Sequence, residues 1–252
     1  MRCLAMAKRR GRIHIGTAGW QIRREHHAHF DEGESALARY ATRFSGVEIN
    51  SSFYRPHRPQ TYARWAAAVP PSFRFAVKMP RAISHELRLR DCDDALARFS
   101  NEVSALGDRL GALLLQLPPK LEWDRSIADA FFAQLRANHA GGVVCEPRHP
   151  SWFSKSAGAL LRRHKIARAA VDPLPAPSAA EPGGWDGLVY YRLHGSPRMY
   201  YSSYESAALL VLAQRLRAGA AKGRDAWCMF DNTARGAATA NALDLLEHCP
   251  VR

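Results

Sequence analysis

The chain lacks several features that would assign it to a familiar class of protein. No apolar run approaches the roughly 20 residues of a membrane-spanning helix. No Gly-x-Gly-x-x-Gly follows the first expected strand, and neither a P-loop nor a Gly-x-Ser-x-Gly elbow occurs. The five cysteines are scattered and contain no Cys-x-x-Cys pair. These absences argue against a membrane protein, a dinucleotide-binding fold and a serine hydrolase of the elbow type.

The cysteines and the first residues bear on localisation. An odd number of unpaired cysteines without a secretory leader is typical of free thiols in a reducing cytoplasm, so we expect a cytoplasmic protein. Residues 1–12 are basic, and their apolar part, 3–7, is too short for a signal peptide. We therefore expect a disordered basic leader over 1–12 and a single domain over 13–252.

The charge is strongly biased to one sign. The formal net charge is +13 over 252 residues, and 47% of the residues are hydrophobic, enough for one large core. Such a charge favours an anionic partner: nucleic acid, a phosphate ester or a carboxylate. Many of the arginines lie in helix-like segments, so a solvated basic surface accounts for the same bias.

Eight strand-like segments alternate with helix-like ones along the chain. We expect strands at 13–16, 47–50, 73–78, 111–117, 142–146, 166–172, 188–194 and 226–231, and helices at 35–44, 60–68, 92–106, 125–138, 151–164, 205–218 and 233–248. Residues 173–187 hold four prolines and three glycines, so the sixth crossover is irregular. Eight parallel units of this kind predict a TIM barrel, an α/β fold; an open doubly wound sheet is the alternative.

Side-chain parity along the strands predicts an unusually polar interior. If the aliphatic faces pack on outer helices, the opposite faces contribute His14, Glu48, Asn50, Arg74, Lys78, Gln116, Glu146, Arg168, Asp172, Arg192, His194 and Asp231. A barrel interior built only for stability would carry Val, Ile and Leu instead, because unpaired buried charges are costly. The arginines could still be structural partners of the carboxylates. The groups nearest the carboxyl ends of the strands are expected to form a site, because barrel sites occupy that rim.

Two further features lie in the turns beyond the strands. The turns His194-Gly195-Ser196 and 232–236, with Asn232 and Arg235, resemble phosphate-binding turns, and Thr233 is an expected N-cap of the last helix. Aromatic residues gather in these loops, and we expect Tyr54 and Tyr201 to touch a ligand.

The strand-end residues resemble the YecE-like family, the domain of unknown function numbered seventy-two. The resemblance is carried by the motifs at 15–20, 47–54, 75–78, 116–119, 146–152, 191–195 and 230–233, in order over nearly the whole chain. It implies a TIM barrel and supports the rim residues, but it supplies no reaction. The proline-rich crossover and the basic leader are this chain's own.

The leading hypothesis is an enzyme that uses acid–base chemistry on a small anionic or phosphorylated compound, with no metal or other cofactor. Its expected catalytic residues are Glu48, Glu146, His194 and Asp231, with Glu48 and Glu146 as acid and base. Its expected substrate-binding residues are Asn50, Tyr54, Lys78, Gln116, Arg148, Arg192, Tyr201, Asn232 and Arg235. The alternatives are a nucleic-acid-binding protein and a metal-dependent phosphodiesterase whose carboxylates and histidine ligate the ion.

Overall fold

The strands and helices alternate as the sequence predicts. A computed structural model describes residues 10–249. The strands are β1 (Ile13–Thr17), β2 (Gly46–Ile49), β3 (Arg74–Lys78), β4 (Leu110–Gln116), β5 (Gly142–Glu146), β6 (Ala167–Arg168), β7 (Ala170–Asp172), β8 (Gly183–Gly184), β9 (Leu188–Leu193) and β10 (Asp225–Phe230). The α-helices are α1 (Ala36–Ala41), α2 (Pro59–Ala67), α3 (Asp93–Ser104), α4 (Arg125–Asn138), α5 (Lys155–Arg163), α6 (Ser206–Ala221) and α7 (Ala237–His248).

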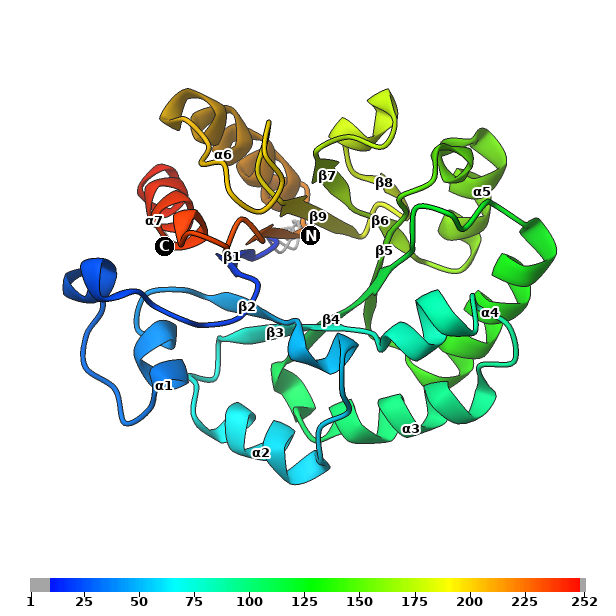
Figure 1. Cartoon of the computed structure of the whole chain (residues 1–252), viewed down its shortest axis with the longest axis horizontal. Helices are drawn as coiled ribbons and strands as arrows, with labels where there is room; N and C mark the ends of the chain where they lie inside the picture. Colours follow the sequence, from blue (N-terminus) through cyan, green and yellow to red (C-terminus); the bar gives the residue numbers. More distant parts are fainter. Residues whose placement is uncertain (1–9, 250–252) are drawn as a thin grey trace, which may run out of the picture.

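The strands form two sheets, with the orders β1-β10-β9-β7 and β2-β3-β4-β5-β6-β8. Every pairing within them is parallel except that of β6 with β8. Figure 1 shows the strands facing a common interior with the helices outside them. The fold is therefore α/β with parallel sheets, which brings the carboxyl ends of the strands together.

A closed barrel is not confirmed, because the described strands make two hydrogen-bonded sheets rather than one closed sheet. The sheets approach each other at two places. Residues 167–172 pair with β5 through β6 and with β9 through β7, on either side of Ala169. An isolated parallel bridge joins Ala18, just after β1, to Glu48 of β2.

Each long strand presents one apolar face to the helices and one to the interior. Val47, Phe75 and Leu113 belong to the larger core, which also takes in Phe131 and Leu135 of α4. A second cluster fills the interior between the strands, and it includes Ala76, Leu114, Val144, Tyr190 and Trp227. Burying an aliphatic or aromatic side chain of this kind stabilises the fold by about 1.5–3 kcal/mol. The interior is thus apolar at mid-height, and its polar groups are confined to the ends of the strands.

The expected inward direction of Arg168 and Asp172 is wrong. Arg168 pairs in register with Cys145, whose side chain lies in the outer core, so Arg168 points outward too. Its guanidinium lies 4.7 Å from the centre of the Phe153 ring. Asp172 is in register with outward-facing Leu193. The parity argument failed here because Ala167, Ala169 and Val171 are the residues that fill the interior.

Three other expectations concern segment boundaries. Helix α7 begins at Ala237 after Gly236, which has a φ of 82°, so Thr233 is not its N-cap. The crossover 173–187 contains only a 3-10 turn (Pro177–Ala180) and β8, in agreement with its proline content. Residues 1–9 of the expected leader lie outside the described residues, whereas the Gly11 amide donates to the carbonyl of Ala220. Among the described helices, none is long and apolar enough to cross a bilayer.

Candidate functional site at the carboxyl ends of the strands

Arg192, from β9, lies at the centre of a charged cluster. Its Nε and Nη2 donate to the two carboxylate oxygens of Glu48, at 2.8 and 2.6 Å. Its Nη1 donates to Glu146 Oε2 at 3.3 Å, and its Nη2 lies 2.9 Å from Asp231 Oδ2. Arg192, Glu48 and Glu146 have no solvent exposure. One guanidinium therefore joins three carboxylates from three different strand ends, and the two-point geometry with Glu48 requires an arginine.

Glu146, the last residue of β5, accepts further hydrogen bonds. The Gln116 side-chain amide donates to its Oε1 at 2.8 Å, and Arg148 Nη2 makes an ion pair with the same oxygen. Arg148 follows β5 by two residues and keeps 11% of its side chain exposed. The contacts of its guanidinium with Glu146 and the neighbouring His194 are both made by Nη2.

His194 connects Glu146 to Asp231. Its Nε2 lies 3.2 Å from Glu146 Oε1 and 3.1 Å from Arg192 Nη1, so this nitrogen faces both an acceptor and a donor. Its Nδ1 lies 3.0 Å from Asp231 Oδ2, without the alignment of a hydrogen bond. The ring of His194 therefore lies between two carboxylates, with Glu146 on the Nε2 side and Asp231 on the Nδ1 side.

The charges of the cluster determine its protonation. Burial alone would raise the pKa of Glu146, but Arg148 and Arg192 hold that pKa well below its ordinary value. Burial opposes the shift of Asp231 as well, yet Arg192 and His194 lower its pKa. Burial would lower the pKa of Arg192, whereas Asp231 and Glu48 raise it. Both carboxylates are therefore ionised at neutral pH, and Arg192 remains charged.

Lys78, the last residue of β3, differs from the arginines in having no carboxylate in contact. Among residues 10–249 its ammonium forms no ion pair or hydrogen bond, and it lies 4.1 Å from the centre of the Phe53 ring. The side chain is 5% exposed. Burial, followed by the repulsion of Arg192, lowers its pKa. Lys78 is thus the cation of the cluster whose donors are not already used by the protein.

The structure brings together eight of the residues that the sequence predicted for the site: Glu48, Lys78, Gln116, Glu146, Arg148, Arg192, His194 and Asp231. Four others do not contact this cluster. Tyr54 is 69% exposed and packs on Phe53, and the Tyr201 ring lies near the guanidinium groups of Arg198 and Arg235. Asn232 is fully buried, and its amide donates to the Ser202 carbonyl and to Asn241.

Asn50 and the turn after β9 are the remaining predicted features. Asn50 follows β2, and its buried Oδ1 has no hydrogen-bond partner among the described residues. The backbone N–H of Gly195 donates to the hydroxyl of Tyr204 at 2.8 Å. The amide that was expected to bind phosphate in that turn is therefore already used within the protein.

Three site residues were missed from the sequence. Phe53 faces Lys78, the Tyr190 hydroxyl donates to Glu48 Oε2 at 3.4 Å, and the Tyr200 ring centre lies 5.7 Å from that of His194. Tyr190 lies two residues before Arg192 on β9, so the two side chains point to the same face of the strand. That spacing was the signal that could have identified Tyr190. The choice of Tyr200 over Tyr201 depends on a positive φ of 70° at Tyr200, which the sequence does not reveal.

The geometry does not favour the metal site of the alternative function, a metal-dependent phosphodiesterase. The carboxylates and histidine that would ligate an ion converge on the guanidinium of Arg192. Among the described residues, no group of three His, Cys, Asp or Glu side chains is arranged to hold a metal. A cation does lie at the centre of these carboxylates, but it is an arginine of the same chain.

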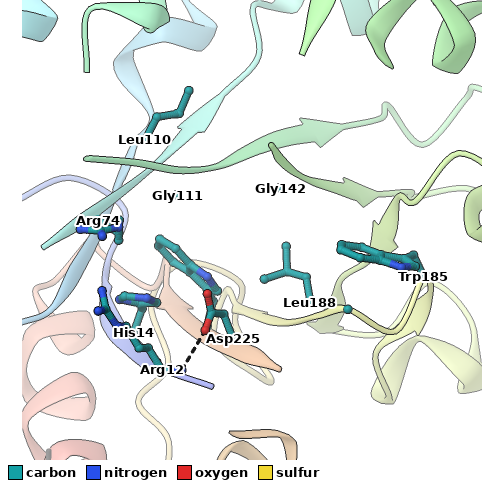
Figure 2. A pocket seen from close by; sticks show the side chains of 11 residues that line it. Arg12, His14, Arg74, Leu110, Gly111, Gly142, Trp185, Leu188 and Asp225 are labelled. Carbon is teal, nitrogen blue, oxygen red and sulfur yellow. Dashed lines mark hydrogen bonds between the residues drawn. The ribbon is translucent and has the colours of Figure 1, made fainter. Parts of the chain in front are cut away.

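A cavity of about 330 Å³ lies at the opposite, amino ends of the strands. Figure 2 shows Arg12, His14, Arg74 and Asp225 around it. Arg74 is the first residue of β3 and Lys78 is the last, so the interior layer that includes Trp227 separates this cavity from the charged cluster. His14 and Arg74 therefore belong to the amino end rather than to the predicted site.

The fold and the site together define a class: an α/β protein whose parallel strands deliver a buried network of acids and bases to their carboxyl ends. The family described as "Protein of unknown function DUF72" matches residues 14–251. The chain belongs to this family, as the resemblance of its strand-end motifs predicted.

Named relatives and solved structures agree with this assignment. UPF0759 protein YecE of Escherichia coli K12 is 34% identical over 145 residues, which are 57% of this chain and 51% of that protein. UPF0759 protein YunF of Bacillus subtilis 168 is 23% identical over 150 residues, 56% of this chain and 52% of that protein. The matched part spans about half the length of each relative.

The solved structures extend over nearly the whole chain. A DUF72 family protein of Thermotoga maritima MSB8 has a TM-score of 0.77 at 22% identity and covers 95% of this chain and 100% of that one. One of Enterococcus faecalis V583 has a TM-score of 0.77 at 20% identity, with 96% and 99% covered. At these identities the likeness shows the fold alone.

Proposed function

We propose that the protein is an enzyme that acts on a small anionic compound by acid–base chemistry at the carboxyl ends of its strands. The observation that carries the proposal is the composition of the cluster: three carboxylates, three cations and a histidine from several strand ends, enclosed together. A structural role alone would not leave Lys78 and part of Arg148 unengaged at such a place.

The contacts suggest how the roles are divided. Both oxygens of Glu48 and both of Glu146 accept hydrogen bonds from the protein, which suits these residues to holding Arg192 and Arg148 in place. Asp231 is 6% exposed and uses Oδ2 for Arg192 and His194. We assign the general base to Asp231, proton relay to His194, and anion binding to Lys78 and Arg148.

The same proposal includes the finer architecture and the compartment. Eight parallel strand segments, counting 167–172 as one, with the Ala18–Glu48 bridge, support a closed eight-stranded TIM barrel. An experimental structure with continuous strand pairing around the ring would test it.

The free, buried thiols of Cys92, Cys145, Cys228 and Cys249 support a reducing cytoplasm.

Hydrogen exchange at carbon tests the chemistry without knowledge of the product. We would incubate the full chain with 2-oxo acids, 2-hydroxy acids and phosphate esters in D₂O and follow loss of C–H signals by proton NMR. Asp231→Asn is expected to slow any exchange by about 10²–10⁴-fold, the usual contribution of a positioned base. Glu205→Gln, at an exposed position away from the cluster, is the matched control.

Each outcome tests the role that the proposal gives to a named residue. Exchange that survives in Asp231→Asn but is lost in Glu146→Gln would move the base to Glu146, as the sequence alone suggested. Exchange that survives in both variants would refute acid–base catalysis by this cluster. If no compound exchanges, and neither inorganic phosphate nor glycolate raises the melting temperature, the proposal fails.

One observation favours nucleic-acid binding as a second candidate. The ring of Tyr201, 38% exposed, lies 4.0 Å from the guanidinium carbon of Arg198 and 5.8 Å from that of Arg235. An exposed ring beside cations can stack on a base while the arginines face phosphates. Fluorescence anisotropy with labelled oligo(dT) should then show affinity that falls steeply with salt and with Tyr201→Ala. Absent or salt-independent binding at low ionic strength would remove this candidate.

A further inference from the structure

We propose that Lys78 forms a covalent imine with the substrate, and that the substrate is a small carbonyl compound bearing a carboxylate. This inference rests on the proposed enzymatic function of the same site and deepens it, because it names the reacting atom and the class of substrate. Three observations carry it: the isolation of the Lys78 amine, its surroundings, and the partly exposed guanidinium of Arg148 in the same cluster.

The first observation is that Lys78 is unlike the chain's other lysines. The four other lysines within residues 10–249, at 120, 155, 165 and 222, are all exposed, whereas Lys78 is 5% exposed. Arginine supplies the other two cations of the cluster, and each of them is paired with a carboxylate. A lysine used only for charge would be expected to have such a partner as well. Lys78 has none among the described residues.

The second observation concerns what surrounds the amine. The Lys78 ammonium lies over the Phe53 ring, and His85 packs on that ring in an edge-on arrangement with 5.0 Å between the ring centres. Burial and the positive charge of Arg192 lower the pKa of Lys78, although Glu48, Glu146 and Asp231 act in the opposite direction. A larger share of the group is thus an uncharged amine at neutral pH, which is the nucleophilic form.

The third observation identifies the substrate class. Arg148 contacts Glu146 through Nη2 alone, and 11% of its side chain is exposed. A carboxylate on the substrate can pair with the remaining donors of this guanidinium, which favour two-point contacts with planar anions. The carbonyl group of the same small molecule would then be presented to Lys78. An aldehyde or ketone next to a carboxylate fits these two demands.

The step balances without an added oxidant or reductant. The lone pair of the Lys78 amine attacks the carbonyl carbon, a C–N bond forms, and the carbonyl oxygen takes a proton. One amine proton is thereby passed to that oxygen, which gives a neutral carbinolamine. Its C–O bond then breaks, the hydroxyl leaves as water with the second amine proton, and a neutral C=N bond remains. Asp231 and His194, which already share a contact, can pass the protons that this exchange requires.

Reductive trapping tests the inference directly. The full chain is incubated with glyoxylate and sodium borohydride, digested, and mapped by mass spectrometry. An adduct at Lys78 would add the mass of glyoxylic acid minus one oxygen atom. Its occupancy is expected to exceed that at any of the four exposed lysines by about tenfold, since only an activated amine reacts preferentially. Acetaldehyde, which lacks the carboxylate, should label Lys78 no better than it labels the exposed lysines.

Variants sharpen the test. Lys78→Arg keeps the charge but lacks the amine, so the adduct should vanish, whereas Lys155→Arg, at an exposed position, should leave it unchanged. Equal labelling of all lysines in the wild-type chain overturns the inference, and this readout does not depend on whether Lys78→Arg folds. Preferential labelling of Lys78 by both aldehydes would overturn the assignment of an anionic substrate.

A separate measurement distinguishes failure of the imine inference from failure of the proposed enzymatic function on which it rests. Glycolate carries the carboxylate but has no carbonyl to attack. If glycolate raises the melting temperature and Arg148→Met abolishes that rise, while no adduct forms at Lys78, then the anion site stands and the imine is wrong. If neither glycolate binding nor trapping is observed, both proposals fail together.

Discussion

Arg192 illustrates how a charge can be buried in this chain. The free-energy cost of burying an unpaired guanidinium would be prohibitive. Here four contacts to three carboxylates compensate for the lost hydration of Arg192. Glu48 depends on Arg192 through both of its oxygens, whereas Glu146 also contacts Gln116 and Arg148, and neither carboxylate is exposed to water. The stability of the cluster is therefore shared, and removal of one member exposes the rest to an uncompensated charge.

Replacement of Arg192 by methionine should destabilise the fold by about 3–5 kcal/mol, the usual cost of removing one partner from a buried charged network. Urea unfolding followed by circular dichroism measures the change. Arg163→Met is the matched control, since Arg163 is 65% exposed and its pair with Asp129 should contribute about 1 kcal/mol or less. Similar losses in the two variants would show that the cluster adds little to stability.

His14 makes a second prediction at this scale. Burial lowers its pKa to about 4, although the Ser45 carbonyl 3.3 Å from Nδ1 favours the protonated form. Between pH 6.5 and 4 the unfolded chain binds a proton that the folded chain does not. Stability is therefore greatest above pH 6.5 and should fall by about 3 kcal/mol as the pH decreases to 4.

The measurement is the free energy of unfolding from urea titrations at several pH values. His14→Gln removes the titrating group, so its decline over this interval should be smaller than that of the wild-type chain by the same amount. Parallel curves for the two proteins would contradict the assigned pKa direction.

At the scale of the element, the turns position the site as much as the strands do. β9 ends at Leu193, and the chain must reverse at once so that Tyr200 can face His194. Gly195 allows this with a φ of 91°, and a Cβ there would meet the Ser202 carbonyl oxygen at 2.8 Å. The glycine is thus required both by backbone conformation and by space.

Gly195→Ala should destabilise the protein by about 1–3 kcal/mol, because strain and a backbone contact act together. Gly107→Ala separates the two effects, since Gly107 has a φ of 51° and open space around it. Its cost should be about 1 kcal/mol, the penalty of the left-handed region alone. Thermal melts of both variants measure the difference, and a loss at Gly107 equal to that at Gly195 would contradict the role of the contact.

At the scale of the whole molecule, the formal charge of +13 works against the folded state. The three cations of the cluster are balanced by three carboxylates. The excess positive charge therefore lies elsewhere in the chain. Repulsion between exposed charges is screened by salt, while buried pairs are screened much less.

The melting temperature should therefore rise when sodium chloride is increased from about 10 mM to about 300 mM, as the screening length shortens. Lys222→Glu, at an exposed position, lowers the net charge by two and should give a higher melting temperature at low salt with a weaker response to added salt. A melting temperature that falls with salt would mean that attractive surface pairs outweigh the net repulsion.

The sequence by itself determined the alternation of strands and helices and the identity of most of the site. Strand periodicity and helix length are local properties, and carboxyl ends of parallel strands meet wherever such strands pair, so Glu48, Lys78, Glu146, Arg192 and Asp231 could be placed together. Only the tertiary structure decided which partner each residue took. The occupancy of both Glu48 oxygens, the isolation of Lys78 and the outward direction of Arg168 depend on register between strands far apart in the chain. A one-residue shift of register moves every side chain of a strand to the opposite face of the sheet, so a strand's own residues do not show which partners its side chains will meet.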